Sequence, residues 1–121
     1  MAKTKTSEGS VVIKTLRGFE HYVLTERTDC EKLRIYDSTY DAICLVAEVG
    51  EVLDVIKKVE RDHDFPEESR EDLLLECGDV LHYLVHLLDD IGCDLEDAAE
   101  ANVEKLENRK KYGKGKHGKR S

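Results

Sequence analysis

Two pairs of acidic residues are the clearest chemical feature of this sequence. Glu48 and Glu51 form the first pair, and Glu76 and Asp79 form the second after 24 intervening residues. A spacing of three places both acids of a pair on one side of a helix. Each pair lies in an apolar stretch, where ionised carboxylates are costly unless a cation compensates them. Two such helices packed face to face would gather four carboxylates, which are the oxygen ligands that Mg²⁺ prefers.

The alternative is a solvated acidic face, which is the usual role of an isolated pair. Two features favour a buried cluster instead. Glu48 and Glu51 interrupt an apolar surface, and the second pair belongs to a polar stripe on an otherwise apolar helix. The stripe comprises Asp72, Glu76, Asp79, Tyr83, His86 and Asp90. Because a helix that is apolar on most sides belongs to the core, we predict that the stripe faces the first pair.

Glycine precedes the second acid of each pair, at Gly50 and Gly78. Glycine inside a helix costs about 1 kcal/mol relative to alanine. We therefore expect these positions to permit a close approach of two helices or to leave room for a ligand.

A third group of polar residues lies further along the chain. Asn102, Lys105 and Arg109 recur at intervals of three and four, which aligns them on one helix edge. Asn102 also occupies a seam position where an aliphatic residue would pack better. Donors and cations of this kind suit phosphate oxygens, and Arg can bind them through two parallel hydrogen bonds. The alternative is an ordinary polar edge with Lys105 paired to a nearby glutamate.

Other metal chemistries have less support. The segment from Asp79 to His82 resembles the Glu-x-x-His element of di-iron bundles, but that architecture needs a second such element, which is missing. His82 and His86 are therefore interpreted as packing or hydrogen-bonding residues. The cysteines show no Cys-x-x-Cys pairing, which predicts reduced thiols in or near the core rather than a disulfide or zinc site. They are Cys30, Cys44, Cys77 and Cys93.

Four helices are predicted to position these groups, so the fold class is all-α. Apolar residues at helical spacing define the first helix, and Ser38 with Asp41 resembles a capping box that opens the second. Gly92 stops the third helix, and Asp94 caps the fourth. The predicted helices span about 11–26, 38–61, 67–91 and 94–111.

The chain of 121 residues is long enough for one helical domain, which we place at 11–112. The polar segment 1–10 is predicted to be a flexible N-terminal arm, 27–37 an irregular connection, and 113–121 a flexible basic tail. The content of 40% hydrophobic and 38% charged residues is typical of a soluble helical protein. A helical domain of this size often gains stability by self-association.

The net charge of -8 argues against specific nucleic-acid binding. Seven of the 19 basic residues lie at or beyond Arg109, which leaves 12 against 27 acidic residues in the rest of the chain. That acidic body would repel a polyanionic substrate unless metal ions and a few placed cations intervene. No apolar run reaches the ~18 residues that cross a bilayer, and the N-terminus does not resemble a signal peptide. We predict a cytoplasmic protein without membrane contact.

The three motifs together resemble the MazG-type members of the all-alpha nucleoside triphosphate pyrophosphohydrolases. They are Glu48-Val-Gly-Glu51, Glu76-Cys-Gly-Asp79 and the segment from Asn102 through Lys105 to Arg109. The resemblance covers roughly residues 15 to 112. In that family the acidic motifs bind Mg²⁺, and the downstream Asn and Lys contact the nucleotide phosphates. The resemblance implies a four-helix bundle, assembled as a homodimer or homotetramer, with active sites between the helices.

The resemblance also implies an enzyme, a hydrolase that converts a (deoxy)nucleoside triphosphate to the monophosphate and pyrophosphate in nucleotide-pool house-cleaning. Mg²⁺ held by the four acids, for which Mn²⁺ is expected to substitute, would neutralise the triphosphate. One carboxylate would orient or deprotonate the attacking water, and Asn102, Lys105 and Arg109 would hold phosphate oxygens. No base-recognition pocket is recognisable. The rival function is a non-enzymatic helical interaction module whose acidic face binds a basic partner.

Overall fold

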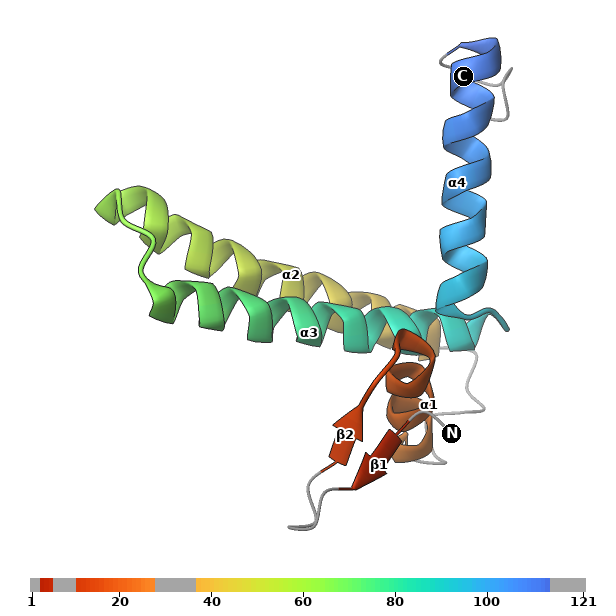
Figure 1. Ribbon diagram of the computed structural model, residues 1–121, viewed down its shortest axis with the longest axis horizontal. Coiled ribbons are helices and arrows are strands. Elements are labelled where there is room, and N and C mark those ends of the chain that lie inside the picture. Colours follow the sequence, from red (N-terminus) through yellow and green to blue (C-terminus); the bar gives the residue numbers. More distant parts are fainter. Residues whose placement is uncertain (1–2, 6–10, 28–36, 114–121) are drawn as a thin grey trace.

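The computed structural model describes residues 3–5, 11–27 and 37–113 (Figure 1). In this part of the chain, four helices carry nearly all of the regular structure, so the predicted all-α class is confirmed. The two strands have three residues each. In chain order, the elements are β1 Lys3–Lys5, β2 Val11–Ile13, α1 Leu16–Glu26, α2 Asp37–Asp62, α3 Glu67–Asp90 and α4 Leu95–Tyr112.

Three predicted segments fall largely outside the described residues. They are the arm at 1–10, of which only 3–5 are described, the connection at 27–37, and the tail at 113–121. The flexibility of the arm and the tail and the irregular structure of the connection therefore stay predictions.

The first helix begins later than predicted. Residues Val11–Ile13 form β2, which pairs antiparallel with β1 so that Val12 lies opposite Thr4. The run of β-branched side chains favours extended backbone over helix. Helix α1 begins after Thr15, whose hydroxyl accepts the Gly18 backbone N–H at 2.9 Å. This cap satisfies an N–H that has no partner within the helix.

Helices α2 and α3 lie side by side as an antiparallel hairpin, which is the centre of the molecule (Figure 1). The predicted break at 62–66 is confirmed: His63 adopts a left-handed φ of 51°, and Pro66 precedes the first turn of α3. The capping box predicted at Ser38 and Asp41 is wrong, because α2 begins at Asp37 and both residues lie inside the helix. Asp41 is instead buried against a cation.

That cation is Arg27, which follows α1 and joins three helices. Its guanidinium donates to Asp41 of α2 at 2.8 Å, and to Asp89 and Asp90 of α3 at 2.9 and 2.7 Å. It also donates to the backbone carbonyl of His86 at 3.2 Å. Burial alone would lower the pKa of Arg27, but Asp90 and the other two carboxylates raise it above its ordinary value. Because buried charges must be paired, this cluster ties α1 to one end of the hairpin.

Helix α4 leaves the end of the hairpin at a steep angle instead of lying along it (Figure 1). Gly92 has a φ of 76°, which redirects the chain after α3, and Asp94 forms the predicted cap as a complete capping box with Asp97. The first turn of α4 is held by α1, since the Glu20 carboxylate accepts the Leu95 backbone N–H at 2.8 Å. The predicted four-helix bundle is therefore not formed within one chain, because the turn at Gly92 directs α4 away from the hairpin of α2 and α3.

The buried core of the single chain is small. In the described residues, the fully buried large side chains are Val23 and Val85. Many large apolar side chains are exposed on the hairpin and on α4, among them Ile43, Val46, Leu53, Leu74, Leu75, Val103 and Leu106. Among the described helices, none is both long and apolar enough to cross a membrane.

Candidate metal centre

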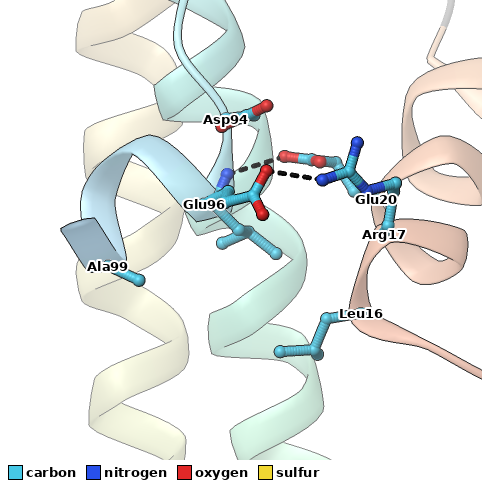
Figure 2. Close-up of a pocket in the computed structure, with 7 residues that line it drawn as sticks. Leu16, Arg17, Glu20, Asp94, Glu96 and Ala99 are labelled. Atoms are coloured by element: carbon cyan, nitrogen blue, oxygen red, sulfur yellow. Dashed lines mark hydrogen bonds and ion pairs between the residues drawn. The ribbon is translucent and has the colours of Figure 1, made fainter.

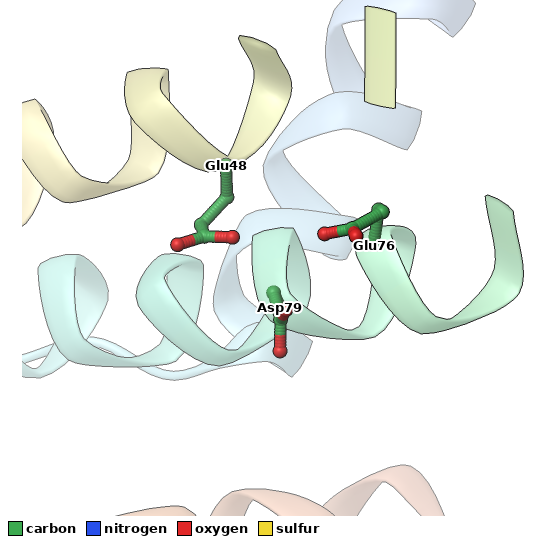
Figure 3. A group of neighbouring side chains, drawn as sticks. All are labelled: Glu48, Glu76 and Asp79. Carbon is green, nitrogen blue, oxygen red and sulfur yellow. The ribbon is translucent and has the colours of Figure 1, made fainter. Parts of the chain in front are cut away.

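Three of the four predicted metal ligands meet between α2 and α3. Glu48 points from α2 toward α3, where Glu76 and Asp79 lie on successive turns (Figure 3). One carboxylate oxygen from each residue lies within 4.8 Å of the other two. Glu48 and Glu76 are half-buried, and Asp79 is exposed. The antiparallel pairing of the two helices brings the acidic motifs together, as the sequence predicted.

The charges of this group repel one another. Burial raises the pKa of Glu76 above its ordinary value of 4.5, and the negative charges of Asp79, Glu51, Glu48 and Asp72 raise it further. Such a shift means that the ionised form is disfavoured as the protein stands. A cation placed among the oxygens would remove the repulsion, and an all-oxygen donor set suits a hard divalent ion. These residues therefore fit a metal site.

Glu51 lies one turn further along α2 and is exposed. It is not part of the three-residue group, although its charge acts on Glu76. The glycines beside the acids do not bring the helices into close contact. A methyl group added at Gly50 or Gly78 would meet no atom within 4 Å. Of the two alternatives, close approach is therefore not observed within the chain, and the space left beside the acids agrees with room for a ligand.

The polar stripe predicted on α3 serves two separate groups. Glu76 and Asp79 face Glu48, whereas His86 and Asp90 belong to the buried cluster around Arg27. The His86 imidazole also lies 3.5 Å from Asp41. Sequence reasoning missed this cluster because Arg27 was assigned to a connection. The signal available was the position of Asp41, Asp89 and Asp90 at one end of the hairpin, whereas the basic residues of the two helices lie toward the other end, at Lys57, Lys58, Arg61 and Arg70.

The predicted phosphate-binding strip is not next to the acids within one chain. Asn102 and Arg109 are exposed and Lys105 is half-buried, all on α4. Helix α4 packs its first turns against α1 and then extends away from the hairpin (Figure 1). In the described chain, the cations and the carboxylates therefore occupy separate places.

The cysteine prediction is corrected in part. In the described residues, Cys44, Cys77 and Cys93 are free thiols. Cys44 is half-buried, but Cys77 and Cys93 are exposed rather than in the core. Cys30 lies outside the described residues.

A hollow between α1 and the start of α4 contains none of the predicted site residues (Figure 2). Arg17 and Glu96 form an ion pair across it, beside the contact between Glu20 and α4. Its lining comprises Leu16, Arg17, Glu20, Asp94, Leu95, Glu96 and Ala99. Two of its polar contacts join α1 to α4, and Asp94 caps α4, so the hollow marks the contact between these two helices.

Comparisons with known proteins identify the family of the chain. Residues 39–113 match the family model of the MazG nucleotide pyrophosphohydrolase domain, which includes both acidic motifs and all of α4. The chain is also similar to the Gene 37 protein of Mycobacterium phage L5, with 34% identity over 87 residues, covering 70% of this chain and 75% of that protein. No solved structure matches the chain significantly. The chain belongs to the MazG nucleotide pyrophosphohydrolase family, and this membership implies an activity of the nucleoside triphosphate pyrophosphohydrolase type.

Proposed function

We propose that the protein is a Mg²⁺-dependent nucleoside triphosphate pyrophosphohydrolase that converts a (deoxy)nucleoside triphosphate to the monophosphate and pyrophosphate. The group formed by Glu48, Glu76 and Asp79 carries this proposal, because it lies within the residues that match the family. We further propose that this activity removes unwanted nucleotides from the nucleotide pool of the cell.

The three carboxylates are proposed to hold Mg²⁺, with Mn²⁺ as a substitute. When bound, the ion supplies charge neutralisation for the phosphate oxygens and polarisation of the phosphorus under attack. The chain itself must orient a water in line with the bond between the α- and β-phosphates and accept its proton. We assign both tasks to a carboxylate of the same group.

Glu51 is proposed as a fourth acid of the site. Its charge already acts on Glu76, and a change of side-chain rotamer would let it join the group, because exposed rotamers interconvert readily. Glu51→Gln should then lower Mg²⁺-dependent turnover. Full activity of this variant would restrict the ligand set to the three residues that already meet.

We propose that the phosphates of the substrate are bound by Asn102, Lys105 and Arg109 from a second copy of the chain. Asn102, Lys105 and Arg109 supply donors for phosphate oxygens, yet their helix extends away from its own acids. Helix α2 also exposes an apolar stripe at helical spacing, which one chain leaves uncovered: Ile43, Val46, Val49, Leu53 and Ile56. Such a stripe favours association. A homodimer or homotetramer would cover it and complete the bundle.

The test is pyrophosphate release from a panel of canonical and modified nucleotides, with Mg²⁺ and then with EDTA. We expect turnover with the metal and none without it. Asp79→Asn should abolish turnover at nearly constant volume and helical content. The matched control is Glu60→Gln, which neutralises an exposed acid of α2 outside the acidic group. Absence of turnover on every nucleotide would favour the rival function, a helical interaction module with an acidic face.

A further inference from the structure

Positive charge is concentrated at the end of α4 and in the residues that follow it. Glu107 is the last acidic residue of the sequence, and seven basic residues come after it. The proposed function uses one of these, Arg109. The other six form what we call the basic segment, and the site chemistry gives them no task. They are Lys110, Lys111, Lys114, Lys116, Lys119 and Arg120.

The described part of the basic segment is accessible to a partner. Lys110 and Lys111 are exposed in the last turn of α4. Each residue turns an α-helix by about 100°, so Lys111 lies at least about 120° around α4 from each residue assigned to the substrate phosphates. Lys110 pairs with Glu107 at 3.0 Å, and both side chains are largely exposed. Because an exposed pair adds little to stability, a phosphate can take the place of this carboxylate.

Helix α4 separates the basic segment from the acidic body of the molecule. The residues before Arg109 include 12 basic and 27 acidic residues, a balance that repels nucleic acid. The helix has 18 residues, is about 27 Å long and extends away from the hairpin (Figure 1). At physiological ionic strength, charges are screened over about 8 Å. The acids of the hairpin therefore act only weakly at the end of α4.

The composition of the segment favours nucleic acid over a membrane surface as its partner. Residues 109–121 contain a single tyrosine and no Leu, Ile, Val, Phe, Met or Trp, whereas a helix that binds a membrane surface also needs an apolar face. Basic runs of this kind are typical of arms that bind nucleic acid. Glycines separate several of the lysines, and glycine permits close approach of the backbone to a ligand.

We propose that the basic segment binds the phosphate backbone of nucleic acid without sequence preference. The binding is electrostatic, and it depends on a local excess of cations rather than on the net charge of the chain. It is therefore compatible with the prediction against specific nucleic-acid binding. Because contacts to phosphates carry no sequence information, the base sequence should not affect the affinity.

The experiment measures binding of the full chain to a short fluorescein-labelled duplex DNA by fluorescence anisotropy. EDTA is present, so that no metal ion bridges the DNA to the acidic group. Each phosphate neutralised adds about -0.9 to the slope of log K against log salt concentration, so we expect a slope of about -5 for the six cations. The affinity should be the same for unrelated duplex sequences.

Deleting residues 114–121 removes four of the six cations and keeps Gly113, whose backbone N–H donates to the Arg109 carbonyl at 2.8 Å. The slope should then fall to about -2, and binding at about 50 mM salt should weaken at least about 10-fold. A full-length variant in which the same four cations are replaced by glutamine should behave like the deletion. This variant excludes an effect of chain length.

The matched comparison removes two charges from each of two places. Lys110→Gln with Lys111→Gln should reduce the slope by about 2. Lys57→Gln with Lys58→Gln removes two exposed cations of α2 and should leave DNA binding unchanged. Equal losses in these two double variants would overturn the proposal, because the whole surface and not the basic segment would then bind.

Three further results would overturn the proposal. They are DNA binding that survives the deletion, binding that discriminates between unrelated sequences, and binding to phosphatidylserine vesicles in place of DNA. Pyrophosphate release by the deletion variant is measured separately and should stay close to that of the wild type. A loss of kcat/KM as large as the loss of DNA affinity would assign the segment to the substrate and overturn the proposal as well.

Discussion

Arg27 and Asp41 form an ion pair with 2.8 Å between Nη2 and Oδ2, and their side chains are only 2% and 4% exposed. The pair joins the end of α1 to the first turns of α2, and Asp89 and Asp90 bring in the end of α3. The hairpin of α2 and α3, which carries the acidic group, is therefore held together at one end by this cluster and at the other by the turn at His63.

Arg27→Ala is expected to destabilise the protein by about 3–5 kcal/mol, because removing one partner leaves buried charge uncompensated. The free energy of unfolding from urea titration measures this loss. The matched control is Arg17→Ala, which removes an ion pair with Glu96 whose side chains are 72% and 61% exposed. That change should cost less than about 1 kcal/mol. Equal losses in the two variants would contradict a special role for the cluster around Arg27.

Glu76→Gln is expected to stabilise the metal-free protein at neutral pH. The pKa of Glu76 is raised in the folded state, so its ionised form opposes folding. That penalty is present above the folded pKa and disappears as the pH falls toward the ordinary value of 4.5. Melting temperatures of wild type and variant should therefore differ at pH 7 and converge near pH 4.5. A constant difference across this range would show that the effect is not electrostatic.

Mg²⁺ is expected to raise the melting temperature of the wild type, since a ligand that binds only the folded state stabilises it. Concentrations about 100 times the dissociation constant would add about 2.7 kcal/mol. Glu76→Gln and Asp79→Asn should lose this response, whereas Glu60→Gln should keep it. Scanning calorimetry with and without millimolar Mg²⁺ measures the shift. A response that survives in Asp79→Asn would place the metal elsewhere.

Mixing two impaired variants is expected to raise activity if the residues that bind the substrate phosphates come from another copy of the chain. Asp79→Asn damages the acidic group and Lys105→Ala the strip on α4, so a mixed dimer retains one intact site of two. Random exchange between equal amounts would recover about a quarter of wild-type turnover. Sedimentation should show a dimer or larger assembly. Recovery of nothing, from variants shown to exchange subunits, would mean that each chain supplies both groups to its own site.

Lys105→Ala is expected to lower kcat/KM by about 10- to 1000-fold through the loss of a charge-assisted contact with phosphate. Deleting residues 113–121 should change turnover much less, because phosphate binding is assigned to the ordered helix rather than to the segment after it. Both variants belong in one steady-state assay, with folding checked by circular dichroism. An equal loss of kcat/KM in the deletion variant would assign phosphate binding to the C-terminal segment instead of to α4.

The local patterns along the chain predicted the four helices, apart from the start of the first, and three of the four acids that meet. Helical spacing, the break at 62–66 and the cap at Asp94 depend on neighbours within a few residues, which the sequence contains directly. The acids at intervals of three had to share a face of their own helix. In the hairpin of α2 and α3 these faces meet, so that Glu48 lies beside Glu76 and Asp79.

Only the tertiary structure decided which distant groups meet. The cluster around Arg27 draws on three helices, and no local pattern links Arg27 to Asp41 or Asp90. The direction of α4 likewise depends on the turn at Gly92 and on its seat against α1. A helix edge such as the one carrying Lys105 looks the same in sequence wherever the helix points, because periodicity specifies a face but not the neighbour that the face contacts.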